Sequence, residues 1–257
     1  MKLIKHIQFN KTENDVGFPY ALGFFNHQII CDDVTIIVGD NGSGKSTLLE
    51  LLSKELSLYQ IGEPLILPKR IDVDLRFHLK RPLGFYFSAE DFTSYIKRLV
   101  NDKREAYKGL KDVDREYEHK SLFSKQQARS AYLRTIAEID KMYEKDLLIS
   151  SHGESYLNFF RSRIRPNQLF ILDEPETPLS FENQLALIYM IHDAVSEGSQ
   201  FIIATHSPVI CAYPHAKIYQ LTKDTISETS YDQLESVHLM KDFLNMPDRY
   251  LNHLLKK

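Results

Sequence analysis

The sequence predicts an α/β fold, with a mainly parallel core sheet, a small antiparallel β-subdomain and a helical insertion. Short runs of β-branched and apolar residues recur along the chain, as expected of a parallel sheet covered on both faces. A glycine-rich loop joins the first of these runs to a helix, and a long charged segment without proline begins near residue 88. These observations together favour one large α/β domain interrupted by helices.

The first apolar run, 34–38, leads directly into the glycine-rich loop. The loop fits the pattern G-x-x-x-x-G-K-[ST], and Leu48 to Leu52 then recur at helical spacing. Glycines let backbone N–H groups surround a phosphate, and the start of the following helix adds positive potential. Lys45 can reach the β and γ phosphates, and the Ser46 hydroxyl can bind Mg²⁺. The predicted phosphate-binding residues are Gly39, Asp40, Asn41, Gly42, Ser43, Gly44, Lys45, Ser46 and Thr47.

Around this loop the chain alternates between strand and helix signals. Apolar and aromatic pieces within residues 1–25 and the alternating run 71–77 predict strands of a small mixed or antiparallel sheet, and 85–87 predicts an aromatic strand. From about 88 to 148, apolar residues spaced among charges predict a helical insertion, without the heptad run of a coiled-coil arm. Its excess of lysine and arginine leaves open a nucleic-acid or partner surface beside the simpler interpretation of a solvated helix face.

Two further apolar runs in the second half of the chain predict buried strands. Residues 169–172 end in Asp173-Glu174-Pro175, and residues 201–204 lead to Thr205-His206. Helices are predicted from about 150, over 181–195, near 234 and from Pro247, and another strand near 218–221. We expect one domain, 1–257, with a β-subdomain and phosphate loop at 1–87, a helical subdomain at 88–160 and a C-terminal region at 161–257.

The buried strands each end in polar residues. Ligands of open parallel sheets bind at the carboxyl ends of strands, so the loop, Asp173, Glu174 and His206 are predicted to converge on one nucleotide. Asp173 would hold Mg²⁺ beside Ser46, directly or through water. Glu174 would accept a proton from the water that attacks the γ phosphate, or orient that water, and His206 would contact that phosphate.

In order and spacing this set resembles the ABC-type ATPases, which include transporter nucleotide-binding subunits, SMC proteins and recombination and repair ATPases. Within that group the chain resembles small stand-alone predicted bacterial AAA-family ATPases with a single ATP-binding cassette. The resemblance implies ATP and Mg²⁺ as cofactors, Lys45, Glu174 and His206 as catalytic residues, and Asp173 as the Walker B aspartate. It also makes the segment Ser151-His152-Gly153-Glu154 a modified signature, which in the family caps the γ phosphate of a second subunit. A nucleotide-dependent homodimer follows from this.

Several positions depart from the family pattern. His152 replaces a glycine of the signature, and Ser180 stands where many relatives have aspartate. No Q-loop glutamine is clear, and Glu90 is the best substitute as a metal-site residue. The residue that stacks on adenine is Phe18 or Tyr20, unless both belong to the core.

Composition limits the cellular setting. The net charge is -3, which gives no global basic footprint for nucleic acid. The two cysteines, Cys31 and Cys211, suggest reduced thiols, although a disulfide between them stays open. We find no signal peptide and no apolar run near the length that spans a bilayer, so a cytoplasmic protein without direct membrane insertion is expected.

The sequence thus predicts an ATPase whose ATP-dependent dimerisation drives a conformational change in an unidentified protein partner. Three alternatives stay open. They are a nucleic-acid-directed sensor in repair or phage defence, the ATPase subunit of a transporter, and an ATP-gated interaction switch with little turnover.

Overall fold

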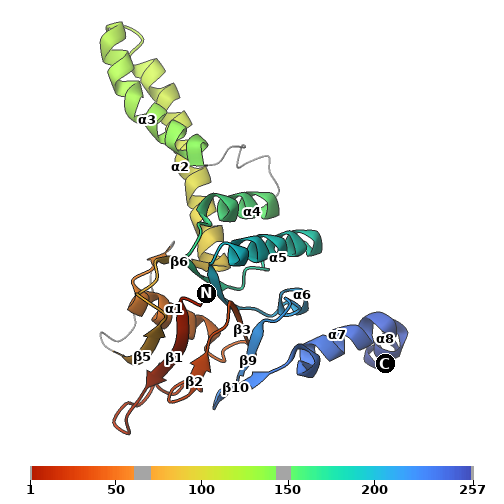
Figure 1. Cartoon of the computed structure of the whole chain (residues 1–257). Helices are drawn as coiled ribbons and strands as arrows, with labels where there is room; N and C mark the ends of the chain where they lie inside the picture. The colour runs from red at the N-terminus through yellow and green to blue at the C-terminus, as the bar shows by residue number, and fades with distance from the viewer. Residues whose placement is uncertain (1, 61–70, 143–151, 256–257) are drawn as a thin grey trace.

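The computed structural model describes residues 2–60, 71–142 and 152–255. Its centre is a seven-stranded sheet of order β10-β9-β3-β8-β7-β6-β4 (Figure 1). Among these strands β10 alone pairs antiparallel, with β9. The predicted mainly parallel α/β sheet is therefore confirmed. The strands are β3 (Val34–Val38), β4 (Tyr59–Gln60), β6 (Gly84–Ser88), β7 (Leu169–Asp173), β8 (Gln200–Ala204), β9 (Lys217–Leu221) and β10 (Ile226–Thr229).

Both faces of this sheet are covered, which explains its apolar sequence. Every residue of β3, β7 and β8 is buried. One face packs on α1 (Lys45–Leu56) and on a second sheet, and the other on α4 (His152–Arg163), α5 (Phe181–Ser196) and α6 (Pro208–Cys211). Since successive side chains of a strand point to opposite faces, Ile36 and Ile37 enter different cores.

The second sheet is antiparallel and three-stranded, with β1 (Ile4–Asn10) between β2 (Gln28–Ile30) and β5 (Asp72–Phe77). The prediction of strands within 18–25 is wrong, because these residues form turns. Phe24 and Phe25 both pack on Phe9 of β1, a contact that successive residues of a strand could not share. The short strands β2 and β10 were not predicted.

The helical insertion is a hairpin of α2 (Ala89–Glu116) and α3 (Leu122–Met142) that projects from the sheet (Figure 1). Lys103 pairs with Asp140, and Asp114 with Arg129, so the helices run antiparallel. Ala106, Leu110 and Ile136 form a small core between them. An aromatic cluster anchors the base of the hairpin to β6 and α4, and it contains Phe85, Phe87, Phe92, Tyr156, Phe159 and Phe160.

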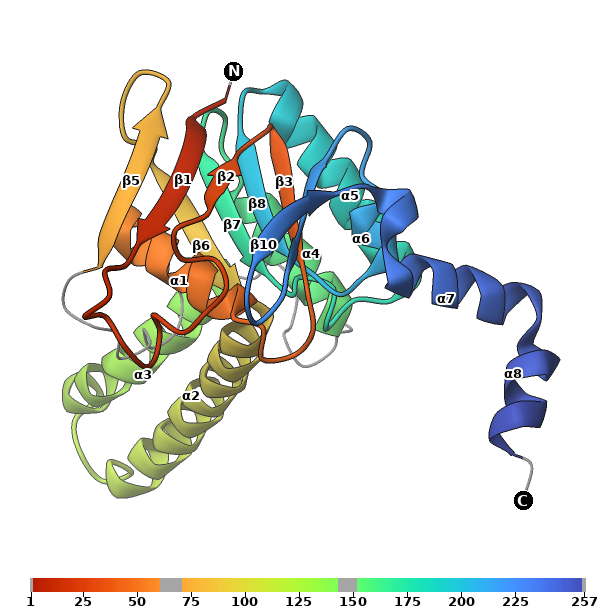
Figure 2. The ribbon, with the colours of Figure 1, turned by 90° about the horizontal axis from the view of Figure 1, so that it is seen from below.

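The C-terminal helices α7 (Glu235–Asn245) and α8 (Pro247–Leu254) follow the short 3-10 turn η1 (Tyr231–Gln233) and extend away from the body (Figure 2). The predicted helix start at Pro247 is confirmed. Cys31 and Cys211 are free and buried in different cores, so they do not form the disulfide that the sequence left open. Within the described ranges, no helix is both long and apolar enough to cross a bilayer.

Candidate functional site

The predicted nucleotide-site segments lie at the carboxyl ends of three neighbouring strands of the central sheet. Strands β3, β8 and β7 are parallel neighbours, and Asp173 is in register with Ala204, the last residue of β8. The phosphate loop follows β3, Glu174 follows β7, and Thr205-His206 follows β8. The carboxyl ends of the strands therefore bring these three segments together, as the sequence predicts.

Glycine is required in the phosphate loop for two different reasons. Gly42 and Gly44 have φ of +79° and +101°, a region that other residues rarely adopt. Gly39 lies so close to β9 that a Cβ atom would stand 2.2 Å from the Leu221 carbonyl oxygen. Asp40 and Asn41 are exposed at the tip of the loop, while Ser43 and Thr47 are buried.

Lys45 is buried and bonded to its own loop. Its Nζ donates to the carbonyl oxygens of Gly39 at 2.9 Å and Asp40 at 3.2 Å, and it lies 2.7 Å from Nε2 of His206. Burial lowers the pKa of Lys45, and nearby carboxylates, first that of Glu174, oppose this shift. The structure thus brings together Lys45 and His206, which are far apart in the sequence.

Asp173 and Ser46 form the part of the site that could hold a metal. Asp173 is 5% exposed, and burial raises the pKa of its carboxyl group to about 6, although a hydrogen bond from Ser46 opposes the shift. Its Oδ1 atom is buried without a hydrogen-bond partner among the described residues. A carboxylate and a hydroxyl are the oxygen ligands that Mg²⁺ prefers, and an orphaned oxygen fits a ligand still to be bound. These residues therefore fit Mg²⁺.

Glu174 lies beside His206 and is accessible from the solvent. Its Oε1 is 3.5 Å from Nε2 of His206, and the two side chains are 41% and 40% exposed. Its φ is +47°, a strained conformation for a residue other than glycine, and its N–H donates to the Ala204 carbonyl at 2.9 Å. Strain of this kind concentrates at functional sites.

Glu176 was not predicted, yet it orients this part of the site. Its Oε1 accepts a hydrogen bond of 2.7 Å from the backbone N–H of His206. The only sequence signal for Glu176 is its position two residues after Glu174.

A second acidic group also escaped prediction. Burial raises the pKa of Glu50 on α1 to about 7, and the carboxylates of Asp91 and Asp173 add to the shift. Glu50 stands four residues after Ser46, so the helical repeat places both on one face of α1. Glu90, the predicted metal-site substitute, is exposed, and its neighbour Asp91 is the residue whose charge reaches Glu50. The metal-site role of Glu90 stays a prediction.

The predicted signature is only partly visible. Ser151 lies outside the described residues, α4 begins at His152, and the side chains of 152–155, which include Gly153 and Glu154, are likewise outside the description. The roles given to these four residues stay predictions. Tyr156, one turn further, is fully buried and packs edge-on against Phe87.

The predicted adenine-stacking residues lie in a turn beside the phosphate loop. Leu22 of this turn stands 3.0 Å from where a Cβ atom of Gly44 would be. Phe18 is 62% exposed, whereas Tyr20 is half-buried and packs on Phe25 with ring centroids 5.2 Å apart. The ring of Phe18 is therefore the more exposed of the two.

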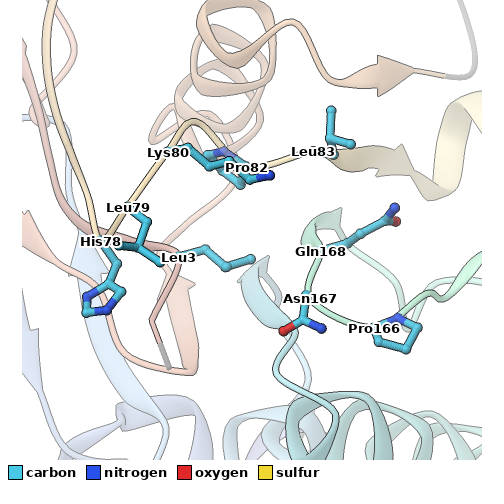
Figure 3. A pocket seen from close by; sticks show the side chains of 9 residues that line it. All are labelled: Leu3, His78, Leu79, Lys80, Pro82, Leu83, Pro166, Asn167 and Gln168. Atoms are coloured by element: carbon cyan, nitrogen blue, oxygen red, sulfur yellow. The ribbon is translucent and has the colours of Figure 1, made fainter.

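A separate cavity of about 270 Å³ lies elsewhere on the molecule (Figure 3). Leu83 and Gln168 directly precede β6 and β7, so the cavity lies at the amino ends of these strands. It contains none of the predicted site residues. Its lining consists of Leu3, His78, Leu79, Lys80, Pro82, Leu83, Pro166, Asn167 and Gln168.

Comparison with known proteins decides the family. The family model described as "ABC transporter" matches residues 24–177, from before the phosphate loop to just beyond Glu176. The chain belongs to the ABC transporter family. A model of an AAA domain matches residues 147–212, which include Asp173 and His206. The resemblance to ABC-type ATPases is therefore confirmed.

Relatives of this ABC-type ATPase are distant but cover most of it. The glutamine transport ATP-binding protein GlnQ of Geobacillus stearothermophilus is 22% identical over 205 residues, 78% of this chain and 80% of GlnQ. The macrolide export ATP-binding/permease protein MacB of Haemophilus ducreyi is 24% identical over 238 residues, 91% of this chain but 32% of MacB. A nucleotide-free ATP-binding cassette from an ABC transporter aligns over 96% of this chain and 97% of its own, with TM-score 0.53 and 15% identity. That likeness shows the shared cassette fold.

Proposed function

We propose that the protein hydrolyses ATP with Mg²⁺ at the edge formed by the phosphate loop, β7 and β8. The observation that carries the proposal is the contact of Lys45, His206 and Glu174: His206 Nε2 lies 2.7 Å from Lys45 Nζ and 3.5 Å from Glu174 Oε1. A phosphate-binding cation, a histidine and an accessible carboxylate thus share one surface. Membership of the ABC transporter family supports ATP as the nucleotide.

In this proposal the γ phosphate takes the place of the carbonyl oxygens that now bind Lys45. The ammonium group of Lys45 leaves the carbonyl oxygens of Gly39 and Asp40 and contacts the phosphates. The N–H groups of the loop contact the phosphates too. Ser46 and Asp173 hold Mg²⁺, which supplies charge neutralisation of the phosphates. Glu174 accepts a proton from the attacking water. His206, held through its backbone by Glu176, contacts the γ phosphate.

The proposed working form is a homodimer closed around ATP. The predicted signature, Ser151 to Glu154, would cap the γ phosphate of the other copy through N–H groups at the start of α4. The exposed ring of Phe18, in the same turn as Leu22 beside Gly44, suits adenine stacking. Closing and opening of the dimer would move an unidentified protein partner in the cytoplasm.

Replacing Glu174 by Gln tests this function. We expect wild type to release phosphate from ATP in Mg²⁺, and Glu174→Gln to bind ATP but to accumulate as a dimer in size-exclusion chromatography. Glu182→Gln, an exposed acid at the start of α5, is the matched control and should behave as wild type. If wild type and Glu174→Gln both form stable ATP-dependent dimers without phosphate release, the protein is an ATP-gated switch and the enzyme proposal fails.

A transporter ATPase subunit is the second candidate, because GlnQ and MacB carry transport functions in their names. Purification of the tagged protein from membranes tests it, since a transporter subunit should copurify with a membrane-spanning protein. The nucleic-acid sensor predicts ATPase stimulation by DNA or RNA that falls steeply with salt. Unchanged turnover at low salt would exclude that alternative.

A further inference from the structure

A cluster of acidic groups, two of them buried (Tyr86 and Asp173) and two half-buried (Glu50 and Asp91), includes the proposed Mg²⁺ residue Asp173. Glu50 comes from α1, Tyr86 from β6, Asp91 from the first turn of α2 and Asp173 from the end of β7. Tyr86 pairs with Ile171, two residues before Asp173 on the neighbouring strand, so its side chain and that of Asp173 lie on the same face of the sheet. Burial raises the pKa of Tyr86, and the charges of Asp173, Glu50 and Asp91 add to the shift, as does a side-chain hydrogen bond with Asp173. The four groups therefore share one environment.

Two acids of the cluster have an oxygen without a hydrogen-bond partner among the described residues. These buried atoms are Glu50 Oε2 and Asp173 Oδ1. Tyr86 is fully buried and Asp173 is 5% exposed. Buried polar atoms are almost always bonded to protein, water or an ion, so orphaned carboxylate oxygens from two different elements indicate a bound group.

Lys45 acts on Asp173, but no cation among the described residues acts on Glu50 or Asp91. Burial and other carboxylates both raise the pKa values of these two acids. Lys45 is the cation of the site, but the carboxylates that act on it are those of Glu174, Asp173, Asp40 and Glu176. A cation beside Asp173 would supply the missing charge.

The geometry limits how such a cation is held. No group of three acidic, histidine or cysteine side chains among the described residues is placed to bind one metal ion directly. Mg²⁺ usually keeps several water ligands, and carboxylates that accept hydrogen bonds from such ligands tune the affinity for the metal. Glu50 and Asp91 would therefore act through water.

We propose that Glu50, together with Asp91, orients the water ligands of a divalent cation held by Ser46 and Asp173. This inference rests on the proposed function, because the cation is the one that accompanies ATP. Glu50 is a positioning residue in this role and does not touch the nucleotide.

The test measures the Mg²⁺ requirement of nucleotide binding rather than turnover. A non-hydrolysable ATP analogue raises the melting temperature of any protein that binds it, and the free Mg²⁺ concentration at half of the Mg²⁺-dependent rise reports metal affinity. We expect Glu50→Gln to increase this concentration by roughly 10- to 100-fold, the usual effect of removing an outer-shell partner. Asp91→Asn should act in the same direction. Glu55→Gln, exposed near the end of the same helix, should leave the midpoint unchanged.

Two further readouts separate this role from a structural one. Without nucleotide and metal, Glu50→Gln should melt at a higher temperature than wild type, because it removes the charge of a half-buried carboxylate whose Oε2 has no hydrogen-bond partner among the described residues. A lower melting temperature, or a Mg²⁺ midpoint within about twofold of wild type, would overturn the inference. If the analogue stabilises wild type in EDTA but Mg²⁺ adds nothing, the inference fails while nucleotide binding stands. If the analogue has no effect on wild type under either condition, the proposed function itself fails.

Discussion

The buried carboxylate of Asp173 should make the nucleotide-free protein less stable as the pH rises. Asp173 is 5% exposed, and burial raises the pKa of its carboxyl group from 3.8 to about 6. The folded protein therefore holds a proton that the unfolded chain releases between about pH 4 and pH 6. Stability falls as the pH rises through this window, and the whole penalty is present above about pH 7.

The size of the penalty follows from the shift. About two pKa units correspond to about 3 kcal/mol at 1.36 kcal/mol each. Asp173→Asn keeps an oxygen that can accept the Ser46 hydrogen bond but removes the charge. At pH 8 in EDTA we expect this variant to be about 3 kcal/mol more stable than wild type, which is about 6 to 12 °C in melting temperature for a chain of this size.

Urea-induced unfolding between pH 4 and pH 8 measures the difference. The gap between Asp173→Asn and wild type should shrink steadily toward pH 4, where both side chains are uncharged in the folded protein. Asp193→Asn, an exposed aspartate on α5, should show no such gap at any pH. A variant that is no more stable than wild type at pH 8 would refute the reasoning, because it would mean that the carboxylate is already satisfied in the free protein.

Three other predictions concern the loop and the C-terminal helices. His206→Ala removes the 2.7 Å contact with Lys45. We expect phosphate release to fall by roughly 100-fold or more, with nucleotide affinity little changed. A large loss of affinity instead would mean that His206 mainly binds ATP. Gly39→Ala would place a methyl group 2.2 Å from the Leu221 oxygen, so a loss of about 1 to 3 kcal/mol or more in urea unfolding is expected, and normal stability would contradict this close approach. Truncation after Met246 removes α8, in which no described residue is buried, and calorimetry should show an unchanged melting temperature.

The fold was predictable because its main signals are local. The β-branched and aromatic residues of β3, β7 and β8 predict their continuous burial, and the loop motif predicts where β3 ends and α1 begins. The errors occur where packing overrides local pattern. Phe24 and Phe25 have the aromatic character of strand residues, but both turn toward Phe9.

The site was predictable only where one segment carries a whole motif. Lys45, Asp173, Glu174 and His206 stand at strand ends, so the parallel order of the strands brings them together. Glu50 and Asp91 approach each other only after α1, β6 and α2 have packed, and no spacing in the sequence reports that. The choice between Glu90 and Asp91 likewise depends on which face of the first turn of α2 meets the sheet.

The close approach of Gly39 to Leu221 affects when the nucleotide site can form during synthesis. Strand β3 lies between β8 and β9, and both neighbours are synthesised after residue 199. The loop is therefore synthesised before the strand that limits its shape. The α2–α3 hairpin, by contrast, has a small core of its own and local contacts, so it can form before β9 is made. A nascent chain halted before β9 would therefore carry a folded hairpin and an unformed nucleotide site.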